Sequence, residues 1–259
     1  MDAAVAPLED TLKRYVLTVQ DFVHLCGIAI VGMFRRPWYV RETMYYMDQI
    51  GVGSLFILVL TGIFTGMVLT LQGAIQLEPY GAVPYVSRLV STSVVRELGP
   101  VLAALMVAGR VGSGIASELA SMQVTEQIDA LRAEGTDPIK KLVTTRLLAS
   151  LIMVPVLTVI TNGIAIFGGY VIARTYLSID SFFYWTWAFD ALRPMDLVYG
   201  LIKPLVFGFI VCMVGCYAGL TTSGGTVGVG QSTTQAMVTS SILILMSDFF
   251  MTKLFIFLG

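Results

Sequence analysis

The amino-acid sequence predicts an all-α integral membrane protein with an N-terminal amphipathic interfacial helix, about five transmembrane helices and a short cytoplasmic helix. Of its 259 residues, 56% are hydrophobic and only 13% are charged, against about 25% charged in soluble domains. No Asp, Glu, Lys or Arg occurs in residues 49–77, 147–173 or 204–247. Each stretch exceeds the roughly 20 residues that cross a bilayer as a helix, and none alternates as barrel strands do. The composition excludes the common soluble enzymes.

The first 48 residues are predicted to form a separate region, an interfacial helix over about residues 8–30 followed by an elbow. Apolar side chains recur at helical spacing: Leu8, Leu12, Tyr15, Val19, Phe22, Val23, Cys26 and Ile30. Charged residues and His24, the single histidine, take the opposite side. One apolar stripe with a charged back is typical of a helix that lies in the membrane interface. A sixth span is the alternative.

Residues 49–259 are predicted to form the transmembrane part, with spans at about 50–77, 94–120, 147–173, 197–220 and 236–258. Residues 174–196 are rich in aromatic side chains, as at a lipid–water boundary. An uncharged loop of Gly, Ser and Thr is expected over residues 221–234. Five Lys and Arg residues in 1–48 and four in 117–146 outnumber the three on the opposite side. This bias places the N-terminus in the cytoplasm and Gly259 outside.

The second predicted span carries two adjacent ridges of small residues at four-residue spacing. They are Ala104, Ala108, Gly112, Ala116 and Ala120, and Gly109, Ser113, Ser117 and Ser121. Small residues let another helix approach closely in lipid, so these ridges are expected to face a second span or a second subunit. The pairs Gly62/Gly66 and Gly215/Gly219 have the same spacing. For these two pairs, ordinary packing inside the chain is favoured.

Charged residues inside the predicted spans are the strongest functional signal. Arg110, Glu118 and Asp248 lie within apolar runs, where each charge costs about 2.5–3.5 kcal/mol and normally faces a partner or a wet cavity. Glu118 follows Arg110 by two turns on nearly the same face, about 12 Å along the axis, so their pairing stays open. A function is favoured over a purely structural role for these charges.

The charged segment at about 121–141 is predicted to be a helix, a break and a second helix. Thr125 is the expected N-cap, with Glu126 in the favourable first turn. Gly135 is expected as the C′ residue of this short helix. Asp137 then restarts a helix as N-cap, with Pro138 at its first position. Such a capped helix suits docking onto a cytoplasmic partner, and a solvated connector is the alternative.

Several motifs are absent from the sequence. There is no G-x-x-x-x-G-K-[ST] stretch to hold a nucleotide, no H-E-x-x-H and no G-x-S-x-G. One histidine does not support most metal sites, and Cys212 and Cys216 are interpreted as small buried residues. A net charge of −1 argues against a nucleic-acid partner. We therefore expect no enzyme activity, metal or cofactor in this chain, and an energy supply from another one.

Several runs of the sequence form a recognisable pattern: residues 62–69 with 71–73, 96–104, 108–113, 125–127 with 137–138, 195–197 and 248–249. Together they resemble the signature of the MlaE family, the permease subunits of bacterial ABC systems that move lipids between membranes. The resemblance implies a homodimer in the bacterial inner membrane, with its C-terminus in the periplasm. It also implies a cytoplasmic ABC ATPase that binds ATP and Mg, a periplasmic MCE-domain protein, a STAS-domain protein and a phospholipid substrate.

With this resemblance, the lipid is expected beside the outer half of the second span. Arg96 would lie near the phosphate, restrained by Glu97, because arginine can pair with phosphate through two parallel hydrogen bonds. The acyl chains are expected against apolar and aromatic residues that precede this span: Leu69, Leu71, Tyr80 and Tyr85. The competing interpretation pairs Arg96 with a carboxylate and gives it no substrate role.

The cytoplasmic segment is expected to couple the permease to the ATPase. Thr125, Glu126, Gln127 and Asp129 are the predicted contact residues, because the two acids can meet basic groups there. The alternative function is an ion- or proton-coupled carrier that uses Glu97, Arg110 and Asp248 as a relay. An intramembrane enzyme is disfavoured because no nucleophile–base pair stands out.

Overall fold

The computed structural model describes residues 6–258, which form helices and their connections without a strand. The α-helices are α1 (Ala6–Phe34), α2 (Val40–Leu77), α3 (Val86–Ser93), α4 (Gly99–Val107), α5 (Ser113–Val124), α6 (Gln127–Ala133), α7 (Thr145–Thr175), α8 (Ser181–Asp190), α9 (Pro194–Leu220) and α10 (Gly225–Leu258). Short 3₁₀ turns η2 (Glu78–Tyr80) and η3 (Val83–Tyr85) follow α2. Single π-helical turns are η4 (Val94–Leu98), η5 (Ala108–Gly112) and η6 (Ile139–Thr144).

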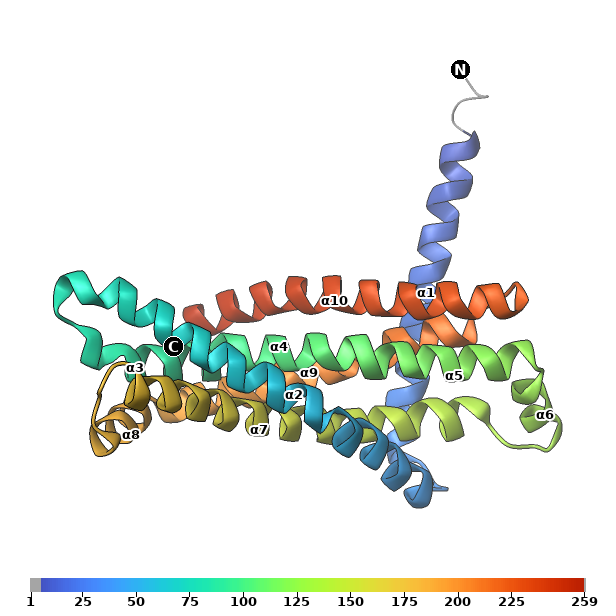
Figure 1. Ribbon diagram of the computed structural model, residues 1–259. Coiled ribbons are helices and arrows are strands. Elements are labelled where there is room, and N and C mark those ends of the chain that lie inside the picture. The colour runs from blue at the N-terminus through green and yellow to red at the C-terminus, as the bar shows by residue number, and fades with distance from the viewer. Residues whose placement is uncertain (1–5, 259) are drawn as a thin grey trace.

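Six helical runs in the described part are long and apolar enough to cross a membrane. Five of them cover the predicted spans: α2, the continuous run from η3 to α5, η6 with α7, α9, and α10. The run from η3 to α5, α7 and α10 extend side by side along one direction, and α2 crosses them obliquely (Figure 1). The prediction of an all-α membrane protein is confirmed.

The predicted loop over residues 221–234 is wrong, because α10 already begins at Gly225. Gly224 and Gly225 take positive φ angles of 90° and 67°, which glycine adopts without steric cost. The turn is therefore complete within a few residues of the end of α9. The small residues that follow continue as helix, which satisfies their backbone groups internally as lipid requires.

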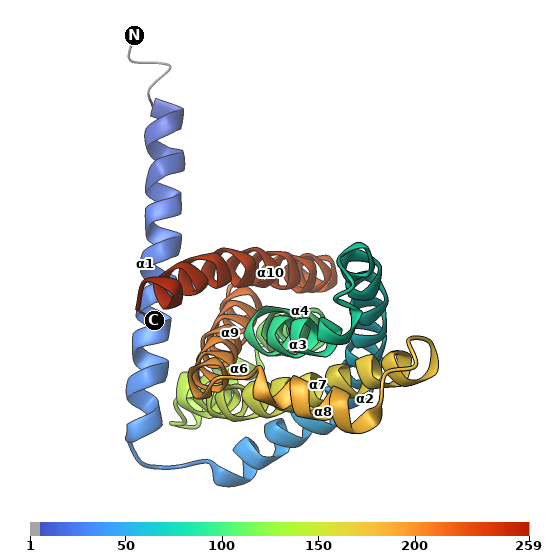
Figure 2. The same cartoon turned by 90° about the vertical axis from the view of Figure 1, so that its left-hand side faces the viewer.

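Helix α1 is the sixth apolar run, over Val16–Phe34, but it lies across the bundle rather than along it (Figures 1 and 2). If the other helices cross a membrane, a helix with this direction lies along the membrane surface. Among its described side chains, Leu25 and Ala29 are buried, and Phe22 packs edge-on against Tyr217 of α9 at 5.6 Å. Placement of α1 in the interface stays a prediction.

The predicted stripe of α1 is only partly used for packing. Phe22 and Cys26 are half-buried against the core, whereas Val19, Val23 and Ile30 are exposed. The side chains of Leu8, Leu12 and Tyr15 lie outside the described part of the structure. His24 is exposed, as its position on the polar face predicted.

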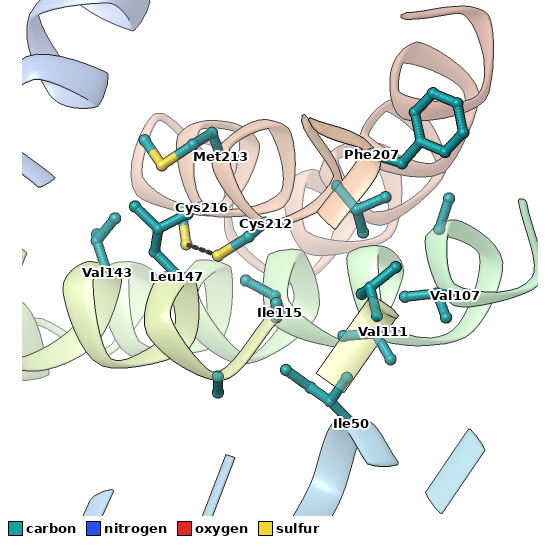
Figure 3. Close-up of a cluster of buried hydrophobic side chains, with 14 of the residues drawn as sticks. Ile50, Val107, Val111, Ile115, Val143, Leu147, Phe207, Cys212, Met213 and Cys216 are labelled. Carbon is teal, nitrogen blue, oxygen red and sulfur yellow. Dashed lines mark hydrogen bonds between the residues drawn. The ribbon is translucent and has the colours of Figure 1, made fainter. Parts of the chain in front are cut away.

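The first small-residue ridge packs inside the chain. Its members Ala104, Ala108, Gly112, Ala116 and Ala120 are all buried. A Cβ atom at Gly215 of α9 would lie 2.9 Å from the Gly112 carbonyl oxygen, and one at Gly219 would lie 2.6 Å from Leu119 Cβ. The partner of this ridge is therefore α9, a second span of the same chain. Figure 3 shows the core where these helices meet.

Two further close contacts agree with ordinary internal packing. A Cβ atom at Gly66 would lie 1.8 Å from the carbonyl oxygen of Ala165, so the glycine lets α2 and α7 approach. The thiols of Cys212 and Cys216 are buried on α9 with their sulfur atoms 3.9 Å apart, and they belong to the core cluster of Figure 3. The second ridge, from Gly109 to Ser121, remains partly exposed.

The aromatic segment after α7 forms α8 rather than an extended stretch. Asp180 caps this helix by accepting hydrogen bonds from the amides of Phe182 and Phe183 at 2.9 and 3.4 Å. Tyr184 is fully buried, and its hydroxyl donates to the carbonyl of Ile166 in α7 at 3.0 Å. Helix α8 thus packs at the end of the bundle opposite α6 (Figure 1).

Candidate functional site

A pocket of 820 Å³ lies at the end of the bundle where α9 begins and α10 ends. Three segments far apart in the sequence meet there: η4 with the end of α3, the first turns of α9, and the last turns of α10. Its lining residues are Thr92, Ser93, Arg96, Glu97, Arg193, Pro194, Met195, Asp196, Tyr199, Lys203, Thr252, Phe255 and Ile256.

Arg96 lines this pocket, and one side of its guanidinium group pairs with Asp196. Its Nη2 atom lies 2.8 Å from Asp196 Oδ1 and 3.0 Å from Oδ2. Asp196 also accepts a hydrogen bond from the Arg193 amide at 3.0 Å, at the first turn of α9. The Arg96 side chain is 47% exposed and that of Asp196 only 5%. Within residues 6–258, the polar side-chain contacts of Arg96 all use Nη2, so its other nitrogens make no such contact.

The base of the pocket holds a buried lysine that the sequence analysis missed. Lys203 Nζ donates to Glu97 Oε2, to Thr252 Oγ1 at 2.9 Å and to the Arg96 carbonyl at 3.1 Å. It also pairs with Asp248 Oδ1 at 2.9 Å, and its side chain is 1% exposed. Glu97, Lys203, Asp248 and Thr252, which we call the Lys203 cluster, therefore join η4, α9 and α10.

A signal for Lys203 was present in the sequence. It is the single charged residue between Asp196 and Asp248, and it falls in the fourth predicted span. The charge-free window of residues 204–247 begins directly after it. A lysine inside an apolar run needs a carboxylate, and Glu97 and Asp248 in other predicted spans were available.

The pocket combines charged side chains with an apolar wall. The cations of its lining are Arg96, Arg193 and Lys203, and the anions of its lining are Glu97 and Asp196. Asp248 pairs with Lys203 from outside the lining. Tyr199 and Phe255 stack at 4.3 Å between ring centroids beside them. A few polar groups beside apolar side chains are typical of a binding site for a small amphipathic molecule.

The structure does not bring the other predicted lipid contacts to this pocket. Leu69 and Leu71 are half-buried on α2, and Tyr80 is 83% exposed in η2. Tyr85 packs edge-on against Trp187 of α8 at 4.7 Å. None of the four lines the pocket, because α2 packs along α7 rather than along α9 and α10. Asp196, rather than Glu97, restrains Arg96.

Arg110 and Glu118 do not pair with each other. Arg110 Nη1 donates to the Gln49 carbonyl at 3.1 Å and to Ser54 Oγ at 3.0 Å. Glu118 instead pairs with Nη2 of Arg146 at 2.8 Å. The sequence analysis missed Arg146, which begins the third span next to a charge-free window and is 0% exposed. Its guanidinium also lies 4.2 Å from the ring centre of Tyr46.

The predicted N-cap of the cytoplasmic helix is wrong. Thr125 ends α5, and its hydroxyl donates to the carbonyl of Ser121 at 2.8 Å. Glu126 then turns the chain with a positive φ of 59°, and α6 begins at Gln127 without a side-chain cap. The threonine hydroxyl is occupied by the preceding helix, so it does not cap the next one. Thr125, Glu126, Gln127 and Asp129 are all exposed.

The end of α6 and the restart after it are as predicted. Gly135 has a φ of 76°, its amide donates to the Arg132 carbonyl, and the Thr136 amide donates to the Leu131 carbonyl, both at 3.0 Å. These two bonds define a Schellman motif. Asp137 Oδ1 accepts from the Ile139 amide at 3.0 Å, with Pro138 before the π-helical turn η6.

Comparison with known proteins gives consistent matches along nearly the whole chain. The family model described as Permease MlaE matches residues 43–254. A probable ABC transporter permease protein of Rickettsia conorii is 43% identical over 242 residues, 93% of both chains. The intermembrane phospholipid transport system permease protein MlaE of Haemophilus influenzae is 34% identical, with 87% of both chains covered. The chloroplastic protein TRIGALACTOSYLDIACYLGLYCEROL 1 of Arabidopsis thaliana is 35% identical over 94% of this chain and 69% of its own.

Proposed function

The chain belongs to the MlaE permease family, and from this premise we propose that it moves phospholipids between the inner and outer membranes as the permease of an ABC transporter. ATP hydrolysis takes place on a separate cytoplasmic subunit that binds ATP and Mg. The observation that carries the proposal is the pocket of 820 Å³, where a half-exposed arginine stands beside an apolar wall. The pocket lies where α9 begins and α10 ends, and these helix ends are at the end of the bundle opposite α6 (Figure 1), which fits a lipid site away from the ATPase.

The pocket suits a phospholipid because its two halves match the two halves of the ligand. Asp196 holds one edge of the Arg96 guanidinium, and the remaining N–H groups can donate to a phosphate in parallel. Tyr199, Phe255 and Ile256 provide the surface for the acyl chains. The salt bridge does not exclude a substrate role, because it leaves the guanidinium half-exposed.

The assembly follows from the same premise. A second copy of the chain completes the permease, the ATPase docks at α6, and an MCE-domain protein covers the pocket end in the periplasm. A STAS-domain protein is a further component. The N-terminus then lies in the cytoplasm of a bacterium and the C-terminus in the periplasm. The exposed polar residues of α6 and the lysine and arginine bias support this orientation.

Replacing Arg96 tests the lipid site. Arg96→Ala is expected to weaken phospholipid binding by the purified complex about tenfold, since a charge-assisted hydrogen bond contributes about 1.5 kcal/mol or more. The complex should stay assembled, because the variant leaves Asp196 hydrogen-bonded to the Arg193 amide. Arg88→Ala removes an exposed arginine outside the pocket and is the control. Wild-type binding by Arg96→Ala, or loss of assembly, would refute the site.

Reversing the charges of Glu126 and Asp129 tests the coupling segment. The double lysine variant is expected to release the ATPase or to uncouple its hydrolysis from lipid movement, because both acids are exposed at the start of α6. Lipid-stimulated ATP hydrolysis and co-purification measure the two effects. Glu78→Lys, an exposed acid at the opposite end, is the matched control. Wild-type coupling in the double variant would assign docking to another segment.

The geometry does not support the alternative of an ion- or proton-coupled carrier. Glu97 and Asp248 share Lys203, but Arg110 contacts neither of them within residues 6–258 and binds Gln49 and Ser54 instead. Thirteen helical residues separate Glu97 from Arg110, about 20 Å along the axis. The three residues therefore do not form a continuous relay.

A further inference from the structure

A second polar pocket lies between α2, α5 and α7, and the proposed function does not use it. We call it the Arg110–Arg146 pocket; it has a volume of 250 Å³, and its polar lining comes from Tyr45, Gln49, Arg110, Glu118 and Arg146. It shares no lining residue with the pocket of 820 Å³. Glu118 and Arg146 belong to the parts of α5 and α7 that approach α6, so this pocket lies in the half of the bundle nearer that helix (Figure 1).

This pocket carries an uncompensated positive charge. Arg146 pairs with Glu118, the single carboxylate of the lining. Arg110 meets only neutral acceptors within residues 6–258, the Gln49 carbonyl and the Ser54 hydroxyl. The Nε atom of Arg146 is buried without a hydrogen-bond partner in the same range. A cation inside a membrane span normally faces a partner, so the pocket lacks one anion.

The backbone leaves room for both the guanidinium and a ligand. A Cβ atom at Gly53 would lie 2.3 Å from Arg110 Nη2, so the absence of a side chain at this position leaves the space that the guanidinium occupies. A Cβ atom at Gly114 would meet nothing within 4 Å, so the space beside Arg110 is open. The hydroxyl of Tyr45 and the amide of Gln49 are exposed at the same place and hydrogen-bonded to each other at 3.3 Å. They add hydrogen-bond donors next to the arginine.

We propose that the Arg110–Arg146 pocket binds the phosphate group of a membrane lipid in the half of the bundle nearer α6. The site rests on the proposed lipid transport and adds a second headgroup site to it. Guanidinium groups pair with phosphate through parallel hydrogen bonds. Val52 and Phe56 of α2, 68% and 74% exposed, provide apolar surface for the acyl chains one and two turns along from Gln49. Free phosphate has the same headgroup chemistry but makes no use of this surface.

Site-specific photo-crosslinking in the purified full chain separates this site from the first one. p-Benzoylphenylalanine is placed at position 45 in one protein and at position 199 in another, and each is mixed with phosphatidylglycerol in detergent. Arg110→Gln and Gly114→Leu are expected to reduce the lipid adduct at position 45 at least fivefold and to leave the adduct at position 199 unchanged. The leucine fills the open space while both arginines remain, so agreement between the two variants excludes a folding defect. Arg96→Gln is the reciprocal control.

The outcomes distinguish the two sites and the two sources of phosphate. An adduct at position 45 that survives both variants, that forms equally with diacylglycerol, or that joins two protein chains instead would overturn the second site. If excess inorganic phosphate leaves the adduct intact, the ligand is the lipid. If excess inorganic phosphate suppresses the adduct, the site binds phosphate and also accepts the free anion. Loss of the adduct at position 199 alone would count against the proposed function and not against this inference.

Discussion

Lys203 and Arg146 are both buried cations on long helices, but the protein surrounds them in opposite ways. Lys203 has two carboxylates, Glu97 and Asp248, which come from segments far away in the sequence. Arg146 has one carboxylate, Glu118, which is 49% exposed, together with the face of the Tyr46 ring at 4.2 Å. Lys203 therefore has two acids around it, whereas Arg146 has one, and the neighbouring Arg110 binds neutral acceptors.

The difference follows from the chemistry of the two cations. A lysine ammonium is a compact, strongly hydrated charge, so its N–H groups need new acceptors when water is removed. Lys203 finds these acceptors in two acids, a hydroxyl and a carbonyl. A guanidinium is delocalised and weakly hydrated, so an aromatic face can cover it. Lys203 thus has a partner for each of its donors, whereas the arginine end retains capacity for an anion.

Removing the lysine should have the largest effect. Lys203→Met leaves two carboxylates side by side without a cation, Asp248 19% exposed and Glu97 42% exposed, which we expect to cost about 3–5 kcal/mol of unfolding free energy. The thermal unfolding temperature of the purified chain in detergent measures the loss. The triple variant with Glu97→Gln and Asp248→Asn removes the charges together and should regain most of the stability. Wild-type unfolding of Lys203→Met would show that the cluster does not hold η4, α9 and α10 together.

Removing the buried arginine should have a smaller effect. Arg146→Met is expected to cost about 3 kcal/mol, the lower end of the range for a broken buried pair, because it leaves one half-exposed carboxylate unpaired instead of two. Arg132→Met, which breaks an exposed pair with Asp129, should leave the unfolding temperature unchanged. If Arg146→Met destabilises the chain more than Lys203→Met does, the contrast between the surroundings of the two cations is wrong.

The neutral partners should have the smallest effects. Thr252→Val removes one hydroxyl from Lys203 and Tyr46→Leu removes the ring from Arg146, each at about 1 kcal/mol. Tyr46→Phe keeps the ring and is the control, with an unfolding temperature close to that of the wild type. A loss in Thr252→Val as large as in Lys203→Met would mean that the hydroxyl, and not the carboxylates, secures the lysine.

Much of the fold could be predicted because its signals are local. The five long apolar runs, the left-handed Gly135 and the cap made by Asp137 each depend on a few neighbouring residues, and all are present. Thr125 failed as an N-cap for an equally local reason, since its hydroxyl serves the helix before it. The glycine-rich start of α10 was misjudged because glycine was taken as a sign of a loop, whereas in lipid the helix is the conformation that satisfies the backbone.

The sequence by itself determined which residues are embedded in apolar helices and which of these are charged. It named Arg110, Glu118 and Asp248 as residues that needed partners, and Arg96 and Glu97 as candidates for a lipid site. Tertiary structure alone decided the partners, because these depend on the depth and rotation of helices that are distant in sequence. Lys203 and Glu97 are 106 residues apart, and Arg96 and Asp196 are 100 apart. Local periodicity sets the face of each residue on its own helix, but the packing of that helix against others decides what the face meets.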